Sequence, residues 1–337
     1  MPLAAPPSAL PKWEFKLTAS DRILTREQMP SEWPLRFDEF RFYTFGLRTG
    51  LANLIHNGTR LGLKKTVGKI TQPINSYTRF PEYSLMHRSI RRFIDSNQHP
   101  ERVKVLDVGS PKCFGLYLAS TTPVDLEMTD ISPLNIDEYK VMWKAIQKGA
   151  KGKASFAIED ARKLRYTPEH FDLVYSMSVV EHVEGETGDS EAIREMVRVL
   201  KPGGLLLLSV PFGAQYVEQM RIGFAHAIEQ PRDQKISFFQ RIYDRSALDL
   251  RILPALREFD AQFYWTVWRE NTLPVRIFTS FGQNAQGALG FVNPWISRWA
   301  NRCGSGIVND VHGKYSQLHS PRDVYGDFVV VARKGVQ

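Results

Sequence analysis

The sequence contains little cysteine and no long apolar run. Its 337 residues include only Cys113 and Cys303, too few for a disulfide framework or a metal cluster by themselves. No apolar stretch approaches the roughly 18 to 20 residues that span a bilayer. The N-terminus lacks a charged segment followed by an apolar one, so we expect no cleaved signal peptide. These absences predict a protein of the reducing cytoplasm.

A surplus of charge is also missing from most of the chain. The formal net charge is +8, but residues 1–100 have 15 Lys and Arg against 8 Asp and Glu, whereas residues 101–337 have 29 against 28. The nearly neutral part gives no support for a groove that binds a polyanion. Aromatic signatures of RNA binding and zinc-ligand spacings are absent as well. Nucleic acid is therefore not an expected partner.

We expect two regions. Residues 1–100 combine a Pro-rich arm with a basic helical region, which would cover the bound ligand and shape the site for a second substrate. Four apolar residues of this region fall on one stripe of the expected helix: Leu47, Leu51, Leu54 and Ile55. An apolar stripe beside Lys and Arg is also typical of a helix that lies on a membrane. Residues 40–70 are therefore a candidate for peripheral contact with the inner membrane surface.

Residues 101–337 begin with alternating strands and helices. Strands are expected at 103–108, 124–129, 154–159, 171–177 and 205–210, and helices at 137–147 and 191–200. This alternation predicts a parallel sheet covered by helices on both faces. The Lys-Pro-Gly-Gly segment at 201–204 is expected to end the second helix in a turn.

The last third of the sequence is less regular. Helices are expected at 214–227 and 246–256, and strands at 259–268 and 328–332. Between the last two strands, an irregular insertion is expected at about 270–320, where glycine and asparagine are frequent and no period is visible.

Acidic residues follow the first three expected strands. They are Asp107, with Gly109 behind it, Asp130 and Asp160. In an open parallel sheet, ligands bind beyond the carboxyl ends of the strands. A carboxylate at Asp130 suits the two hydroxyls of a ribose, and one at Asp160 can accept a hydrogen bond from an adenine amino group. Local roles are the alternatives: helix caps at Asp107 and Asp160, and a turn at Asp130.

The order and spacing of several motifs carry a family resemblance. Besides the three acids they are Phe171-Asp172-Leu173-Val174, Glu181-His182-Val183 and Leu200-Lys-Pro-Gly-Gly204. From about 103 to 211 the chain resembles the class I S-adenosylmethionine-dependent methyltransferases, in particular the small-molecule type with a methyltransferase type 11-like core.

The resemblance implies a fold, a cofactor and a set of site residues. The fold is an α/β, Rossmann-like, seven-stranded, mostly parallel sheet with helices on both faces, plus an N-terminal helical region; its last strand is antiparallel. The cofactor is S-adenosylmethionine. The residues implied to bind it are Asp107, Gly109, Ser110, Asp130, Ile131, Asp160, Ala161 and Ser176.

The loop after the first strand departs from this family. The family usually has Gly-x-Gly after the acidic residue, whereas Ser110-Pro111-Lys112 stands here. Pro111 stiffens the turn, so we expect a different backbone path around the donor. The missing glycine also disfavours an NAD-dependent oxidoreductase. A protein with this fold that serves only as an interaction module is a second hypothesis.

His182 is the candidate catalytic residue. Histidine suits general-base work near neutral pH, and its position after the fourth strand places it near the donor methyl group. The alternatives are a structural role or a wall of the donor pocket. In similar ubiquinone-type O-methyltransferases, an acidic residue occupies the position of Ser178. Its absence predicts that no metal is obligatory.

Missing motifs narrow the acceptor. The Asn/Asp-Pro-Pro-aromatic loop and the Cys-Pro loop of nucleobase methylation are absent. Val210-Pro-Phe-Gly213 and Arg241-Ile-Tyr-Asp244 look like segments of methyltransferases from glycan or specialised-metabolite pathways, but for Arg241 and Asp244 a structural ion pair is the favoured alternative. The expected function is in-line methyl transfer from S-adenosylmethionine to a small-molecule, glycan-linked or lipid-linked acceptor.

Overall fold

The computed structural model describes residues 39–57, 79–213, 215–222, 236–269, 305–309 and 324–336. The predictions for the N-terminal arm, for residues 58–70 and for most of the insertion lie outside these ranges.

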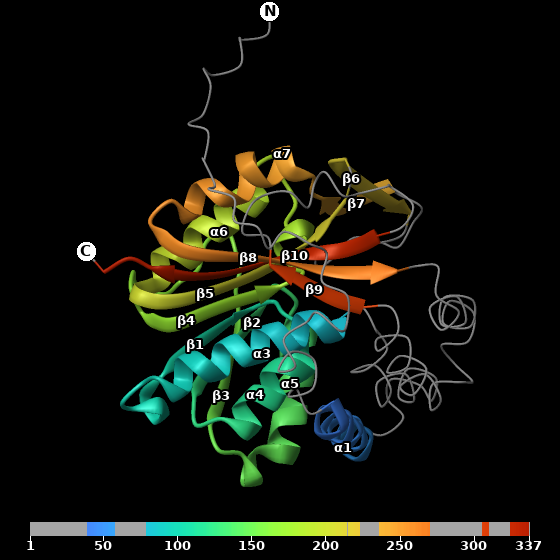
Figure 1. Cartoon of the computed structure of the whole chain (residues 1–337). Coiled ribbons are helices and arrows are strands. Elements are labelled where there is room, and N and C mark those ends of the chain that lie inside the picture. Colours follow the sequence, from blue (N-terminus) through green and yellow to red (C-terminus); the bar gives the residue numbers. More distant parts are fainter. Residues whose placement is uncertain are drawn as a thin grey trace, which may run out of the picture.

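An eight-stranded sheet forms the centre of the described structure (Figure 1). Its strands, in spatial order, are β3 (Lys153–Ile158), β2 (Asp125–Asp130), β1 (Lys104–Val108), β4 (Phe171–Met177), β5 (Leu200–Phe212), β10 (Val324–Lys334), β8 (Phe259–Arg269) and β9 (Ser305–Asn309). The first five are parallel to one another, and β10 is antiparallel to both of its neighbours. All seven expected strands are therefore present, with the expected antiparallel last strand.

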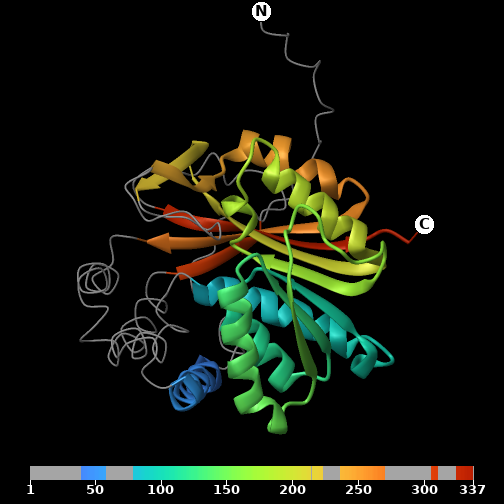
Figure 2. The ribbon, with the colours of Figure 1, turned by 180° about the vertical axis from the view of Figure 1, so that it is seen from behind.

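Helices cover both faces of this sheet, as predicted (Figures 1 and 2). One face carries α3 (Arg79–Asp95), α4 (Lys112–Thr121) and α5 (Pro133–Ile146). The other carries α6 (Gly188–Val199) and a helical run that starts with α7 (Arg245–Ala247) and continues through Leu248–Ile252 to Leu253–Leu256. An outer helix, α1 (Glu39–Asn57), packs beside α5 and α4.

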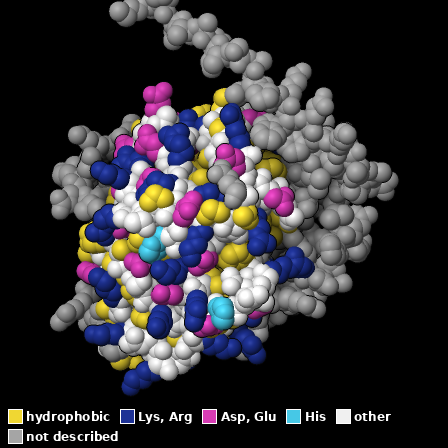
Figure 3. Space-filling view, turned by 90° about the vertical axis from the view of Figure 1, so that its left-hand side faces the viewer, with side chains coloured by type: hydrophobic (Ala, Val, Ile, Leu, Met, Phe, Trp, Pro, Cys, Tyr) yellow, Lys and Arg dark blue, Asp and Glu magenta, His cyan; other side chains and the backbone are white. Residues whose placement is uncertain are grey.

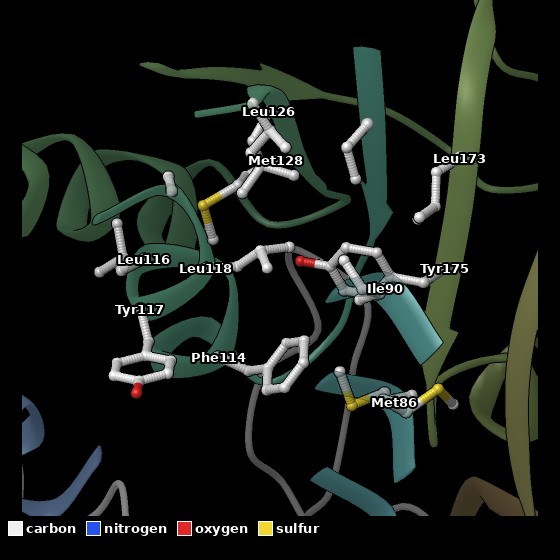
Figure 4. Close-up of a cluster of buried hydrophobic side chains, with 14 of the residues drawn as sticks. Met86, Ile90, Phe114, Leu116, Tyr117, Leu118, Leu126, Met128, Leu173 and Tyr175 are labelled. Carbon is white, nitrogen blue, oxygen red and sulfur yellow. The ribbon is translucent and has the colours of Figure 1, made fainter. Parts of the chain in front are cut away.

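Two apolar clusters, one on each face, hold these layers together. Successive side chains of a strand point to opposite faces, so Val105 joins the cluster under α3, α4 and α5 while Leu106 joins the cluster under α6. Figure 4 shows the first cluster, where Met86 of α3 and Phe114 of α4 approach Tyr175 of β4. Strands buried on both faces explain the near-continuous apolar runs of the sequence.

The helix expected at 214–227 is wrong. Its described part contains β6 (Val217–Ile222), which pairs antiparallel with β7 (Ile236–Ile242) in a separate two-stranded sheet. The pairing joins Val217 to Ile242 and Ile222 to Ile236. Cross-strand partners this far along the chain are invisible to a local pattern, and they override the helical period.

The turn expected at 201–204 is also wrong, although α6 does end where predicted. Val199 is its last residue, and Leu200 is already extended. Lys201–Gly204 form the irregular start of β5, whose register against β4 shifts between Phe171 and Leu173. Gly203 has a φ of 73°, a conformation that favours glycine at this bulge. Within the expected insertion, the one described segment is β9, which extends the sheet beyond β8.

The apolar stripe of α1 is partly exposed. Leu51 and Ile55 are 51% and 72% accessible, whereas Phe42 is buried and packs edge-on against Tyr83 and Tyr117. Among the described helices, none is long and apolar enough to cross a membrane. On the face seen in Figure 3, Lys and Arg are interspersed with Asp and Glu, in keeping with the balanced charge of residues 101–337.

Candidate functional site

The candidate site lies where the strand order reverses. From β1 the chain proceeds outward to β2 and β3 and then returns to β4 on the other side of β1. The carboxyl ends of β1 and β4 therefore diverge into loops that lead to opposite faces, which is where open α/β sheets bind ligands. The residues expected at the site come from these strand ends.

Asp107 is buried behind the loop. Its Oδ1 accepts a hydrogen bond from the Ser110 backbone N–H at 2.9 Å, and its Oδ2 accepts one from the Tyr175 hydroxyl at 2.9 Å. Burial raises the pKa of Asp107 to about 6, although nearby Lys112 and these hydrogen bonds act in the opposite direction. Because Ser110 precedes α4, whose N-cap is Pro111, Asp107 organises the loop and does not cap a helix.

Gly109 and Ser110 fix the loop against β4. Gly109 has a φ of 68°, and a Cβ built there would lie 2.8 Å from Cγ1 of Val179. No other residue fits that position without a shift. Ser110 is buried, and its Oγ accepts a hydrogen bond from the Met177 backbone N–H at 3.0 Å. Ser176 is buried too, with its hydroxyl donating to the Val108 carbonyl at 2.9 Å.

Asp130, at the end of β2, is held by Lys112 of the unusual loop. The Lys112 Nζ makes a short ion pair with Asp130 Oδ2 and also donates to the Gly109 carbonyl at 3.2 Å. The Ser132 backbone N–H donates to Asp130 Oδ1 at 2.8 Å, so the turn proposed as an alternative for this residue is present. Beside it, Ile131 is 41% exposed.

Asp160, after β3, is held by Arg162. The Arg162 guanidinium reaches both carboxylate oxygens, with Nη2 2.6 Å from Oδ2 and Nε 3.0 Å from Oδ1. These hydrogen bonds lower the pKa of Asp160. The segment is a turn, closed by a backbone hydrogen bond from Lys163 to Asp160, so no helix begins there for Asp160 to cap. Ala161 is half-buried within it.

The structure thus brings the predicted donor residues to one edge of the sheet. Hydrogen bonds join Asp107 to Ser110 and tie Ser110 and Ser176 to the neighbouring backbone, and Lys112 links the Gly109 carbonyl to Asp130. Asp160 and Ala161 follow β3, the neighbour of β2. The cationic partners, Lys112 and Arg162, were not among the predicted site residues, although Lys112 stands in the loop that departs from the family pattern.

His182 has a defined orientation. Its Nδ1 lies 2.6 Å from the Phe239 carbonyl of β7, an acceptor only, so Nδ1 carries the proton and donates it. In the neutral ring the lone pair is then on Nε2, which lies 3.7 Å from Oε1 of buried Glu181. The His182 side chain is 20% exposed.

Glu82 is a carboxylate that the sequence did not reveal. It lies on α3, is fully buried, and accepts hydrogen bonds from the hydroxyls of Ser178 at 3.2 Å and of Ser209. Ser178 has a φ of 47°, unusual for a residue other than glycine. Ser178 directly follows β4, and Ser209 lies within β5. No local sequence pattern predicts that these two serines contact a helix of the first hundred residues.

The ion pair expected between Arg241 and Asp244 is wrong. Arg241 is buried and pairs with Glu218 at 3.2 Å and with Asp189 at 3.9 Å. Asp244 instead accepts a hydrogen bond from the Ala247 backbone N–H at 2.8 Å and caps α7. Arg241 also donates to the carbonyls of Val183 and Gly185, so it anchors the loop that follows His182.

Metal ligands are not clustered in the part of the chain that the structure describes. There, no group of three or more His, Cys, Asp or Glu side chains is placed to hold a metal ion. That no metal is obligatory remains a prediction.

Comparisons with known proteins agree with this geometry. Residues 106–208 match the family model of a methyltransferase domain. Over 129 residues the chain is 33% identical to the ubiquinone/menaquinone biosynthesis C-methyltransferase UbiE of Pseudomonas aeruginosa, covering 36% of this chain and 48% of that protein. It is also 33% identical over 97 residues to an Arabidopsis thaliana tRNA (carboxymethyluridine(34)-5-O)-methyltransferase, covering 24% of each chain. The chain thus spans about half the length of the UbiE relatives it matches.

Among solved structures, a similar one is an S-adenosylmethionine-dependent methyltransferase from Methanosarcina mazei. It is 18% identical, with a TM-score of 0.45 over 75% of this chain and 98% of that chain. The [4+2]-cyclase SpnF is 20% identical, with a TM-score of 0.45 over 74% and 81%.

The strand order, with its reversal between β1 and β4, defines a Rossmann-like α/β protein. Within it, residues 106–208, which contain all the predicted donor residues, match the model of a methyltransferase domain, in line with the expected resemblance to the class I S-adenosylmethionine-dependent methyltransferases.

The raised pKa of Asp107 predicts a pH-dependent stability. The folded protein keeps this proton up to about pH 6, while the unfolded chain releases it near the ordinary value of 3.8. The stabilisation from the protonated Asp107 is therefore complete below the unfolded-state pKa, and it is lost as the pH rises through the folded-state pKa. Relative to Asp107→Asn, the free energy of unfolding of the wild type should fall by about 3 kcal/mol between about pH 3 and pH 7.

Urea denaturation across this pH range measures the difference. Asp137→Asn is the control, because the Asp137 side chain is 75% exposed and its removal should leave the pH slope unchanged. Equal slopes for the wild type and Asp107→Asn would contradict the prediction.

Proposed function

We propose that this chain transfers the methyl group of S-adenosylmethionine to a small-molecule acceptor. The observation that carries the proposal is the position of Asp130. Its carboxylate lies at the end of β2, linked through Lys112 to the Gly109 loop, within the segment matched by the methyltransferase family model. The donor's ribose hydroxyls would bind this carboxylate.

The other residues of this edge fit the same donor. Gly109 presents backbone without a Cβ, so a ligand can approach closely. Ile131, which is exposed, and Ala161, which is half-buried, would supply apolar contacts to an adenine ring, and Asp160 would supply an acceptor for its amino group. Asp107 has both oxygens committed to the protein, so its contribution is the shape of the loop.

The chemistry requires positioning first. When bound, S-adenosylmethionine supplies an electrophilic methyl group on a sulfonium, and the acceptor's lone pair forms the new bond as the carbon–sulfur bond breaks toward sulfur. The protein's part would be to hold the acceptor in line with that bond. A protic acceptor also loses a proton, and His182 Nε2 would take it while Phe239 keeps the ring oriented and Glu181 stabilises the charged form.

The class of acceptor belongs to this proposal as well. The UbiE relatives are C-methyltransferases of ubiquinone and menaquinone biosynthesis, which supports a small molecule. The narrower form of this proposal is a glycan-linked or lipid-linked acceptor, whose binding site residues 1–100 would shape. A cytoplasmic location, at the inner membrane surface when α1 is engaged, completes the proposal.

A non-catalytic interaction module is the second candidate. It is favoured by one specific feature: Asp130 and Asp160, the two carboxylates proposed for the donor, are both paired with cations of the same chain. A protein that no longer binds the donor would keep these two ion pairs permanently.

Calorimetric titration with S-adenosylhomocysteine separates the two candidates. We expect the full chain to bind it, and Asp130→Ala to bind it about tenfold more weakly or worse, because hydrogen bonds to a charged acceptor are lost. The exposed Asp137→Ala on α5 should behave as the wild type. Absent binding to the wild type and to Asp130→Ala alike would defeat the enzyme hypothesis.

For His182 the expected effect is on turnover. With an acceptor found by donor-coupled screening, His182→Gln should lower kcat by about 100-fold or more, the usual contribution of a general base. The affinity for S-adenosylhomocysteine should not change. A kcat equal to that of the wild type would assign His182 to structure.

Membrane contact can be tested on α1. Because Leu51 and Ile55 are exposed beside the exposed Arg41 and Arg48, the intact chain should sediment with anionic vesicles more than with neutral ones. Leu51→Glu combined with Ile55→Glu should abolish the difference. Sedimentation that does not depend on anionic lipid would dispose of this contact.

A further inference from the structure

Lys112 occupies the centre of the proposed donor site. It is the first residue of α4 and belongs to the segment that replaces the family's glycine pattern. Its ammonium has three partners: the Asp130 carboxylate, the Gly109 carbonyl at 3.2 Å and the face of the Tyr139 ring, whose centroid is 4.8 Å away. The Lys112 side chain is 21% exposed and that of Asp130 is 10% exposed, so water screens the pair only partly.

The ammonium uses the same atoms that a ribose would need. A bidentate contact with two ribose hydroxyls requires both oxygens of Asp130. Oδ1 already accepts from the Ser132 backbone, and Oδ2 accepts from Lys112 and from the Asn135 Nδ2 at 3.1 Å. A carboxylate oxygen offers about two acceptor sites, and on Oδ2 both are filled.

We propose that Lys112 competes internally with the donor for Asp130, so that donor binding requires its ammonium to withdraw. This inference rests on the proposed function. Two partners remain available after withdrawal, the Gly109 carbonyl and the Tyr139 ring, so the charge is not left without compensation. The flexible four-carbon stem of lysine permits the movement.

Arg162 provides a contrast within the same site. It grips Asp160 with three hydrogen bonds from its guanidinium, and the Asp160 side chain is 35% exposed. With the Arg162 backbone N–H included, each oxygen of Asp160 also has two donors, but this carboxylate is more exposed than that of Asp130, so an amino group can reach it in exchange with water. The lysine at Asp130 is the partner that blocks the ligand directly.

Competition of this kind lowers the apparent affinity by the fraction of molecules whose Asp130 is available. Removing the ammonium should therefore tighten donor binding, although an ordinary lysine near a ligand would weaken binding when removed. For a partly buried ion pair, the expected gain is about fivefold.

The experiment is a calorimetric titration of the full chain with S-adenosylhomocysteine. Lys112→Met should bind about fivefold more tightly than the wild type. Lys140→Met, which removes the same charge from an exposed site on α5, should bind as the wild type does. Lys112→Gln serves as a second variant, with thermal unfolding confirming that each protein is folded.

Salt provides a second reading of the same competition. Between about 0.05 and 0.5 M sodium chloride, screening weakens the ion pair, so the wild type should bind this net-neutral ligand more tightly as salt rises. Lys112→Met should show no such rise.

Chemical labelling reports the movement itself. Mass spectrometry should show that acetic anhydride labels Lys112 faster when S-adenosylhomocysteine is bound, because the ammonium has left its carboxylate partner. The labelling rate of Lys140 should not change.

The outcomes are distinct. Equal or weaker binding by Lys112→Met and Lys112→Gln, or slower labelling of Lys112 in the bound state, overturns this inference and leaves the proposed function intact. If no variant binds S-adenosylhomocysteine, the proposed function falls and this inference falls with it.

Discussion

The buried carboxylate of Asp107 is the constraint on which the rest of the site depends. It joins the end of β1, the loop at Ser110 and the middle of β4 at Tyr175 through two hydrogen bonds of 2.9 Å each. Because these donors are neutral and the group is fully buried, its ionised form is costly. A Cβ at Gly115 would lie 2.8 Å from Asp107 Oδ2, so α4 must present a glycine there to pack over the carboxylate.

The carboxylates of Asp107, Asp130 and Asp160, at one edge of the sheet, differ in how accessible they are to a ligand. Asp107 is closed off by neutral donors, Asp130 is paired with a lysine at partial burial, and Asp160 is gripped by an arginine near solvent. In the proposed function, a ligand would exchange with Lys112 at Asp130 and share Asp160 with Arg162, whereas both oxygens of Asp107 are held by the protein. Aspartates that follow one another at the strand ends therefore have different roles, and the role of each depends on how deeply it is buried.

The parallel core and most of the candidate site could be predicted because local sequence determines them. The strand at 171–177 matches β4 in both bounds, the acids at 107 and 130 lie at strand ends, and Asp160 follows β3 by two residues. The failures share a physical cause, which is dependence on distant partners. β6 exists because β7 pairs with it, and Arg241 pairs with Asp189 although Asp244 is three residues away. Nothing near a residue in the chain reveals such partners.

The contact of Glu82 with Ser178 and Ser209 has a consequence for the order of folding. Its hydroxyl partners lie 96 and 127 residues further along the chain. Closing loops of that length costs conformational entropy before any stabilising contact forms. Glu82 of α3 therefore cannot form its hydrogen bonds until β4 and β5 have joined the sheet. During synthesis, α3 leaves the ribosome long before its anchors do. The helix that carries Glu82 is thus made well before the strands that fix its carboxylate in place.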